Sequence, residues 1–231
     1  MSSTWREARD GLSDISPALV ACVPIGLLYG ALSAGKGLSL AETALMSMSV
    51  FAGGAQFAAV EIWRTPAPVA VLAFSTLLIN LRHVLMSASL APKTGGWASW
   101  QRFLGFYVLA DENWAMAERR AARQPLTPAY FFGAIVPFYC GWVVFSGLGA
   151  VAGSFLGDPK RIGADFAFTA LFIGLVAGFW KGRSTAITVV ASAVASAGAY
   201  WLFGPPWHVA AGAVAGIAAA AVTWRPEGER A

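Results

Sequence analysis

The stretch PAPVAVLAFSTLLINLRHVLMSASLA, residues 66–91, decides the fold class of this chain. Its residues are apolar or small apart from a central polar run, Asn80-Leu81-Arg82-His83. As a helix it is long enough to cross about 30 Å of hydrocarbon. An arginine near the middle of such a span costs at least about 2.5 kcal/mol by insertion scales. Arg82 therefore has to face a partner, a cavity or water, and it marks a candidate functional site.

The composition of the whole chain also indicates a membrane protein. Of its 231 residues, 57% are hydrophobic and 12% are charged, whereas a soluble domain carries roughly a quarter charged residues. The net charge is +4, but the basic residues lie in short loops between apolar segments, so we expect no nucleic-acid partner. Cys22 and Cys140 lie in apolar segments without metal-site spacing, and we interpret them as small core residues.

Eight hydrophobic stretches follow an amphipathic leader. They cover approximately residues 16–33, 40–63, 66–91, 103–116, 129–156, 164–180, 185–203 and 209–224. We predict helices throughout, because an open sheet edge cannot exist in lipid and the alternation of a membrane barrel is absent. The predicted fold is an all-α polytopic transmembrane bundle with about seven to eight membrane segments, some of them discontinuous or kinked. We expect a cytoplasmic leader at 1–15, one transmembrane domain at 16–224 and a cytoplasmic tail at 225–231.

The distribution of lysine and arginine predicts the orientation. If every stretch crosses the membrane and the N-terminus is inside, ten basic residues lie inside and five outside, with Arg82 within the membrane. In this arrangement Arg64 and Arg119 are inside, whereas Lys36 and Lys93 are outside. Both termini are thus predicted to be cytoplasmic, unless one of the stretches is re-entrant. The fourth stretch is too short to cross unless its helix begins near Trp100 or continues to Arg120.

Glycines predict two further features. Gly53 and Gly54 interrupt the second stretch near its middle, with Gln56 at the same depth, which favours a broken helix over a tight helix crossing. Pro24 with Gly26 predicts a kink in the first stretch. Glycines also recur at four-residue spacing, which predicts close helix packing: Gly26 and Gly30; Gly149, Gly153 and Gly157; Gly174 and Gly178; Gly212 and Gly216.

The polar residues predict a site in the third and fourth stretches. Asn80 and His83 share one helix face, and Arg82 lies nearly opposite, so this helix must be central or unwound. Asp111 and Glu112 are the available counter-charges, and a carboxylate near Arg82 suits proton coupling. Three plainer interpretations remain open: a structural ion pair, a hydrogen-bonded core histidine, and a carboxylate at a water-exposed helix end.

Several motifs then resemble a known family. They are Pro24-Ile25-Gly26 with Tyr29-Gly30, Met46-Ser47, Val50-Phe51-Ala52-Gly53-Gly54-Ala55-Gln56-Phe57, Asn80-Leu81-Arg82-His83-Val84-Leu85-Met86, Asp111-Glu112, Asp158-Pro159, Gly163-Ala164-Asp165-Phe166-Ala167 and Leu171-Phe172. In this order, the motifs resemble the AzlC/YgaZ family, the large subunit of bacterial branched-chain amino acid exporters. The resemblance implies a multi-pass protein of the bacterial cytoplasmic (inner) membrane. It also implies a small hydrophobic partner subunit of the AzlD/YgaH type. The C-terminal third is similar only in being apolar.

A zwitterionic amino acid needs a cation for its carboxylate, an acceptor for its ammonium group and an apolar pocket. Our hypothesis assigns the carboxylate to Arg82 with Asn80, and the ammonium group or a coupling proton to Asp111 or Glu112. His83 would relay protons. Backbone exposed at Gly53-Gly54, with Gln56, would complete the substrate site. Because no ATP-binding motif is present, we expect the proton-motive force to drive export.

Three alternative functions remain. A scaffold subunit would tolerate substitution of its polar residues, a membrane-embedded enzyme would turn over substrate without a gradient, and a passive channel would show uncoupled flux. No nucleotide-binding loop, zinc signature or nucleophile elbow is present. We therefore predict a secondary transporter, not an enzyme, with no cofactor and no metal.

Overall fold

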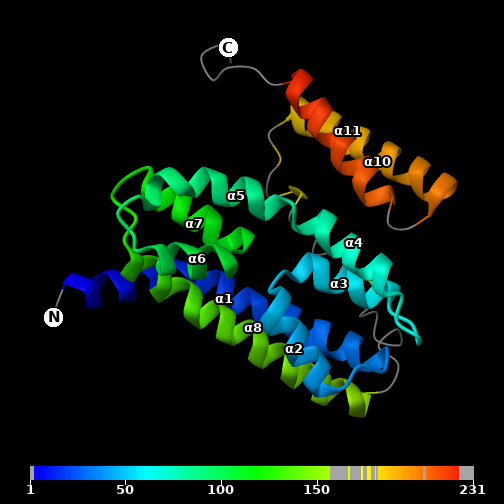
Figure 1. Cartoon of the computed structure of the whole chain (residues 1–231), viewed down its shortest axis with the longest axis horizontal. Coiled ribbons are helices and arrows are strands. Elements are labelled where there is room, and N and C mark those ends of the chain that lie inside the picture. Colours follow the sequence, from blue (N-terminus) through cyan, green and yellow to red (C-terminus); the bar gives the residue numbers. More distant parts are fainter. Residues whose placement is uncertain are drawn as a thin grey trace. The chain divides into compact units, whose positions relative to one another are not determined.

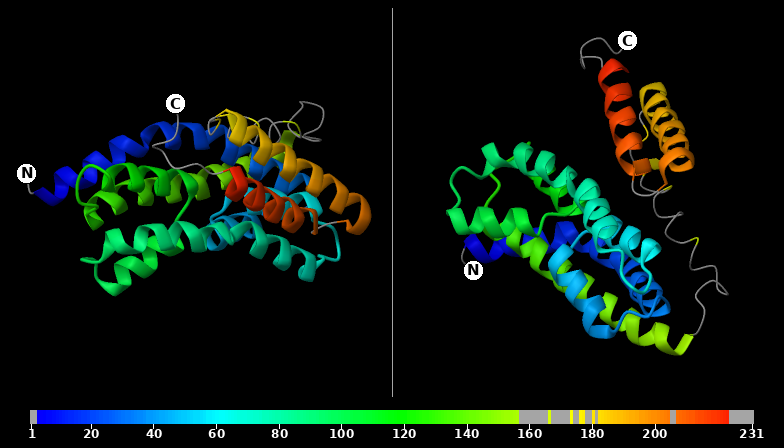
Figure 2. Two further views of the ribbon diagram at one scale, coloured as in Figure 1. Left: turned by 90° about the horizontal axis from the view of Figure 1, so that it is seen from above. Right: turned by 45° about the vertical axis from the view of Figure 1, so that its right-hand side comes forward.

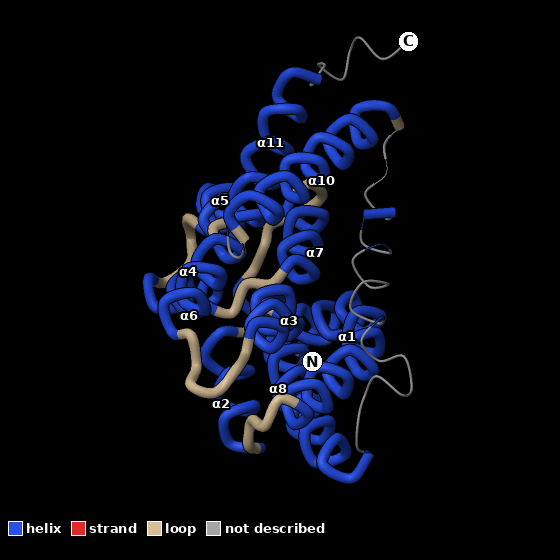
Figure 3. The backbone as a smooth tube through the Cα atoms, turned by 90° about the vertical axis from the view of Figure 1, so that its right-hand side faces the viewer, coloured by secondary structure: helices blue, strands red, loops and turns tan. Residues whose placement is uncertain are grey.

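The computed structural model describes residues 3–156, 182–204 and 207–223, together with positions 166, 173, 176, 177 and 180. These residues form helices and connecting loops, with no strand among them (Figure 3). The all-α prediction is confirmed. Most of the predicted segment 164–180, the tail at 225–231, and Gly157, Gly174 and Gly178 lie outside the described residues.

The chain divides into two compact units. Unit 1 contains residues 1–64 and 80–165, and unit 2 contains residues 65–79 and 166–231. Every residue of the predicted polar site belongs to unit 1.

Unit 1 is built on two long helices, α1 (Ser3–Gly35) and α8 (Pro128–Leu156), which lie side by side (Figure 1). They run parallel, since Gly11 lies against Tyr130 and Gly30 against Ser146. A Cβ atom at either glycine would overlap the facing backbone, so the close approach requires glycine at both positions. The predicted role in close helix packing is confirmed for Gly26, Gly30, Gly149 and Gly153.

The leader and the first hydrophobic stretch form one continuous helix. α1 has 33 residues, passes through Pro17 and Pro24 without interruption, and is about 50 Å long at 1.5 Å per residue. That length exceeds the hydrocarbon thickness, so α1 can cross the membrane and still extend its charged first turns beyond it.

The second hydrophobic stretch folds back on itself. It contains α2 (Leu40–Val50) and α3 (Gly53–Ile62), each about 15 Å long. Gln56 of α3 donates to Ser47 of α2 at 3.1 Å, and Lys36, just before α2, donates to the Glu61 carbonyl near the end of α3 at 3.1 Å. α2 and α3 are therefore an antiparallel helical hairpin, and its tip is at residues 51–52. The predicted break is confirmed, and it reverses the chain.

The fourth stretch forms a second helical hairpin. α6 (Ser99–Tyr107) and α7 (Asp111–Ala121) are separated by a tip at residues 108–110. The indole of Trp97, before α6, donates to the Leu126 carbonyl, after α7, at 2.9 Å. α6 begins near Trp100 and α7 ends near Arg120, which are the bounds that we predicted for a full crossing of the membrane. The chain reverses its direction between the two helices.

These reversals correct the predicted sides of several charges. Lys36 was assigned outside and Arg64 inside, yet Lys36 contacts Glu61, three residues before Arg64. Lys93 is predicted outside and Arg119 inside, yet Lys93 pairs with Glu118, the residue directly before Arg119. The assignments were wrong because two stretches counted as crossings are hairpins.

α5 (Arg82–Leu90) and a short 3-10 helix, η1 (Ala91–Thr94), complete unit 1. α5 lies beside α7 and runs parallel to it, because Arg82 contacts Asp111 and Ser89 contacts Glu118. The start of α5 thus lies at the tip of the α6–α7 hairpin.

Unit 2 contains α4 (Val69–Asn80, up to Ile79), α10 (Arg183–Phe203) and α11 (Trp207–Thr223). α10 and α11 form an antiparallel pair (Figure 2), in which Gly212 and Gly216 lie against Ser192. The packing role predicted for this glycine pair is also confirmed. The ring of Phe74 packs on Trp207, with centroids 5.5 Å apart.

Four helical stretches of the described chain are long and apolar enough to cross a membrane, judged by length and composition. They are Thr4–Gly35, Val69–Thr94, Pro128–Gly153 and Arg183–Phe203. The helices of the two hairpins are each about half that length, so neither hairpin arm can cross alone.

Candidate functional site

The tips of the two hairpins meet inside unit 1. At the first tip, Phe51 adopts a left-handed conformation (φ 40°, ψ 45°) that ends α2 and leaves the carbonyl groups of its last turn without helical donors. Two tyrosine hydroxyls replace those donors: Tyr139 of α8 donates to the Met48 carbonyl at 2.8 Å, and Tyr107 of α6 donates to the Ser49 carbonyl at 3.0 Å. Tyr107 is the last residue of α6, so it connects one tip to the other.

Gln56 fixes the first hairpin from within. Its side chain is fully buried. The amide nitrogen donates to Ser47 at 3.1 Å, and the amide oxygen accepts from the Trp142 indole at 2.9 Å. Both ends of the amide are thus engaged with α2 and α8, which gives Gln56 a role in holding the tip in place.

Gly53 and Gly54 are the first two residues of α3. No side chain caps this helix end, and both glycines are half-buried. The backbone N–H groups of a first helical turn have no partner within the helix, and the helix dipole favours an anionic group there. A Cβ atom at Gly53 would lie 3.3 Å from the Trp142 ring. A larger residue would therefore press on the indole that holds Gln56.

Asn113 closes the second tip. It is fully buried. Its side-chain oxygen accepts from the Ala110 N–H at 2.7 Å, and its side-chain nitrogen donates to the Val108 carbonyl at 3.1 Å. These bonds satisfy two backbone groups that the interruption between α6 and α7 leaves unpaired.

His83 links the start of α5 to the same tip. One ring nitrogen, Nε2, lies 2.9 Å from the Leu109 carbonyl, and the other, Nδ1, lies 3.2 Å from the Asn80 carbonyl. Both neighbours are acceptors. The neutral ring donates to one of them, whereas the protonated ring donates to both. His83 thus connects the start of α5 to the tip of the second hairpin.

Of the two predicted counter-charges, Asp111 forms the ion pair with Arg82, and their side chains are 38% and 35% exposed. Two polar atoms beside the pair have no partner among the described residues: the Nε atom of Arg82 and the Oδ1 atom of Asn80 are buried without a hydrogen bond. The site therefore offers one free donor on a cation and one free acceptor, two residues apart.

The face of α7 that carries Asp111 continues towards its C-terminal end as a polar contact with α5. Trp114 donates to the Ser89 hydroxyl at 2.8 Å, and that hydroxyl donates to Glu118 at 2.8 Å. Glu118 also pairs with Lys93. Residues 111, 114 and 118 are spaced as one helix face, so this face is fully committed to α5.

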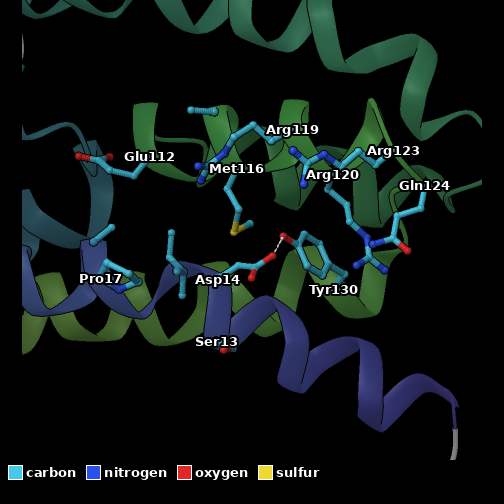
Figure 4. Close-up of a pocket in the computed structure, with 13 residues that line it drawn as sticks. Ser13, Asp14, Pro17, Glu112, Met116, Arg119, Arg120, Arg123, Gln124 and Tyr130 are labelled. Atoms are coloured by element: carbon cyan, nitrogen blue, oxygen red, sulfur yellow. Dashed lines mark hydrogen bonds between the residues drawn. The ribbon is translucent and has the colours of Figure 1, made fainter. Parts of the chain in front are cut away.

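Glu112 lies on the opposite face of α7. It is exposed and forms no salt bridge with a described residue. It lines a cavity of about 830 Å³ between α1, α7 and the start of α8, together with Asp14, Met116 and Tyr130 (Figure 4). The structure thus separates the two neighbouring carboxylates, placing Asp111 at the ion pair and Glu112 in the cavity.

The end of this cavity away from Glu112 is rich in arginine. Arg120 bonds both oxygens of Glu7 at 2.8 and 2.7 Å, and its guanidinium lies over the Tyr130 ring, 4.4 Å from the centroid. The Tyr130 hydroxyl donates to Asp14 at 2.5 Å. Arg119 and Arg123 also line the cavity and are exposed, with no acidic partner among the described residues.

The structure gathers most of the predicted site residues. Arg82, Asp111, Asn80 and His83 meet at the tip of the second hairpin, while Gly53, Gly54 and Gln56 form the first hairpin. Sequence reasoning did not identify the residues that hold the two tips: Tyr107, Asn113, Tyr139 and Trp142. The only signal for Asn113 was an amide two residues after Asp111, and the aromatic residues are typical of any membrane span.

The described residues contain no group of three or more His, Cys, Asp or Glu side chains placed to hold a metal ion. Cys22 is buried and Cys140 exposed, and both are free thiols.

Comparison with known proteins finds membrane and transport proteins of similar length. The chain is 30% identical over 193 residues to an uncharacterized membrane protein of Archaeoglobus fulgidus, which covers 82% of this chain and 83% of that protein. It is 27% identical over 236 residues to the inner membrane protein YgaZ of Escherichia coli, covering 96% of this chain and 91% of the relative. It is 25% identical over 199 residues to the branched-chain amino acid transport protein AzlC of Bacillus subtilis, covering 84% and 78% of the two chains.

No solved structure gives a significant match to this chain. The family model described as AzlC protein matches residues 17–156, which include both hairpins and the Arg82–Asp111 pair. That match extends over more than half of the chain, and with the relatives of similar length it establishes that this membrane protein belongs to the AzlC family.

Proposed function

We propose that this protein exports branched-chain amino acids across the bacterial cytoplasmic membrane and that the proton-motive force drives it. The observation that carries the proposal is the meeting of two half-length helical hairpins at a polar site in unit 1. Discontinuous helices that end near the membrane midplane are how many secondary transporters present backbone and side-chain groups to a substrate.

The chemistry of the tip suits a zwitterion. The free Nε–H of Arg82 can donate to a substrate carboxylate, and the free Oδ1 of Asn80 can accept from a substrate ammonium group. The N-terminal turn of α3, with Gly53 and Gly54, offers further backbone donors to the carboxylate. In this proposal Gln56 acts through the hairpin it holds and does not itself touch the substrate.

Asp111, Glu112 and His83 are proposed to couple transport to protons. Protonation of Asp111 would release Arg82 for the substrate carboxylate, because a neutral carboxyl no longer holds the guanidinium as an ion pair. His83 bridges α5 and the hairpin tip, so a change in its protonation alters the same contact. Glu112, exposed in the cavity, is suited to exchange protons with water.

The named relatives support the substrate class and the membrane. One relative is named a branched-chain amino acid transport protein and another an inner membrane protein. A small hydrophobic subunit of the AzlD/YgaH type is proposed as a partner, on the resemblance of the sequence motifs alone.

The charges of unit 1 support a cytoplasmic N-terminus. At the end of unit 1 where α1 begins lie Arg6, Arg9, Lys93, Arg102, Arg119, Arg120 and Arg123. Lys36 and Arg64 lie at the other end. Among the described basic residues of unit 1 near its ends, seven against two favour the first end as the inner one. The C-terminus, in the other unit, is proposed to be cytoplasmic from the sequence pattern.

Counterflow of radiolabelled leucine in reconstituted vesicles tests the proposal. We expect uptake that responds to a pH gradient, and an Arg82→Gln variant that folds but loses about tenfold to hundredfold in rate, because it removes a charged hydrogen-bond donor. Arg9→Gln, an exposed position without a described partner, is the matched control. The partner is tested by repeating the assay with and without a co-expressed small hydrophobic subunit of the AzlD/YgaH type.

Full counterflow by Arg82→Gln would overturn the assignment of the site. Flux that ignores the pH gradient would overturn proton coupling. Chemical turnover of leucine in detergent would instead indicate an enzyme.

A further inference from the structure

The cavity between α1, α7 and α8 is not part of the hairpin-tip site. Its lining on α7 includes Glu112, Met116 and Arg119, spaced three or four residues apart on one face, and Arg123 follows just after the helix. The opposite face of α7 carries Asp111 and is committed to α5. One short helix thus separates two polar sites.

The charges in the cavity are balanced once internal pairs are removed. Arg120 is neutralised by Glu7, which holds it with two hydrogen bonds. Among the described residues, two cations, Arg119 and Arg123, then remain without an acidic partner, and two carboxylates, Glu112 and Asp14, remain without a basic one. A cavity of this kind favours a ligand that carries both charges over a simple anion such as phosphate.

Glu112 is separated along the cavity from the two unpaired arginines. Seven residues, about 10 Å along the helix axis, separate Glu112 from Arg119. The side chains of Arg119 and Arg123 extend towards Glu112 (Figure 4). For Arg119, this is the direction in which long helical side chains lean.

The wall between the charged ends is apolar. Ile15, Pro17 and Ala18 of α1 face Ala115 and Met116 of α7. The volume of about 830 Å³ lies within the range of about 300–1,000 Å³ that is usual for small-molecule sites. An aliphatic side chain can be accommodated there while the charged groups of its amino acid meet the two poles.

We propose that this cavity binds a zwitterionic amino acid with an apolar side chain, as an entry site on the inner side of the membrane. Glu112 receives the ammonium group, Arg119 with Arg123 receives the carboxylate, and Met116 with Ile15 contacts the side chain. The proposal rests on the proposed transport function, because it takes its substrate class and its inner side from it. It adds a second binding site, one residue along the chain from the Arg82–Asp111 pair.

Cysteine protection in the full-length protein tests the site directly. In a variant with Cys22→Ala and Cys140→Ser, a cysteine is introduced into the cavity wall as Ala115→Cys, or as Ala18→Cys if the first variant fails to fold. Ala122→Cys, exposed outside the cavity, is the control position. We expect L-leucine at ten times its Kd to slow maleimide labelling of the cavity cysteine about tenfold, with no effect at the control.

Ligand analogues and charge variants identify the poles. Leucinamide, which lacks the carboxylate, and 4-methylpentanoate, which lacks the ammonium group, should protect about tenfold to hundredfold more weakly than leucine, since each loses one charged contact. Glu112→Gln and Arg119→Gln should weaken leucine protection similarly. Asp10→Asn and Arg9→Gln, exposed on α1 without described partners, should leave it unchanged.

Equal labelling with and without leucine at both cavity positions would overturn the proposal. Protection by 4-methylpentanoate as strong as by leucine would also overturn it, because the cavity would then be a plain anion site. Leucine counterflow measured on the same preparation separates the two claims. Counterflow without protection would support transport and contradict the cavity site. Protection without counterflow would support the cavity site and contradict the transport function.

Discussion

Replacing Gln56 by leucine removes the side chain that holds the first hairpin. Leucine is similar in size but cannot hydrogen-bond, so the Trp142 N–H is left buried without an acceptor and Ser47 loses its donor. An unpaired buried donor costs about 1–3 kcal/mol, and the second lost bond about 1 kcal/mol. We therefore expect Gln56→Leu to lower the free energy of unfolding by about 2–4 kcal/mol.

The assay is thermal denaturation in detergent, in which size-exclusion chromatography measures the folded fraction after heating to each temperature. For a chain of this size the expected loss lowers Tm on the order of 10 °C. Glu61→Gln, exposed on the same helix, is the matched control and should leave Tm unchanged. Adding Trp142→Phe to Gln56→Leu should cost less than the sum of the two single changes, because the unpaired N–H is then absent.

A Tm for Gln56→Leu within about 2 °C of the wild type would refute this reasoning, since the buried amide would then contribute almost nothing to stability. If in addition the KM for leucine rose while Tm stayed constant, Gln56 would be a substrate contact and not a support for the hairpin.

Three further predictions concern the packing and the tips. Gly30→Val should destabilise the protein by at least about 3 kcal/mol in thermal denaturation, because the new side chain would overlap α8, whereas Gly96→Val, with open space around it, should have little effect. Tyr107→Phe removes the hydroxyl that links the two tips and should lower the free energy of unfolding by about 1 kcal/mol. The rate of leucine counterflow should fall by a larger fraction than the stability does. An unchanged rate would show that transport does not depend on this contact. In a double-mutant cycle, Arg82→Gln and Asp111→Asn should show a coupling energy of about 1–3 kcal/mol. This is less than for a buried pair, because both side chains are about one third exposed. Additive effects of the two changes on Tm would rule out the ion pair.

Much of the fold followed from local properties of the chain. The length and hydropathy of the stretches predicted helices, since backbone groups in lipid must be paired within their own segment. Gly53 and Gly54 predicted the interruption of the second stretch, and the polar run at Asn80–His83 predicted a helix that is either central or unwound there. A counter-charge for Arg82 at Asp111 or Glu112 was also predicted, because an isolated charge at that depth needs one, and the structure selects Asp111.

The direction of the chain after each interruption was not predictable in the same way. Residues 40–63 and 99–121 are each long enough to cross a membrane if straight, and a broken helix can either continue or reverse. Asp111 faces α5, whereas Glu112 faces the cavity beside α1, because these helices lie on different sides of α7. Which helices flank α7 depends in turn on whether the chain continues or reverses at each interruption.

The sequence by itself determined the helices, the interruption beside Gly53 and Gly54, and the charges that had to be paired. The tertiary structure alone decided that two interrupted segments are hairpins whose tips meet. The physical reason lies in contacts between distant residues: Tyr107 with Ser49, 58 positions apart, Gln56 with Trp142, 86 apart, and Met48 with Tyr139, 91 apart. Those bonds satisfy the backbone and amide groups that a reversal exposes, and no local pattern in the chain specifies them.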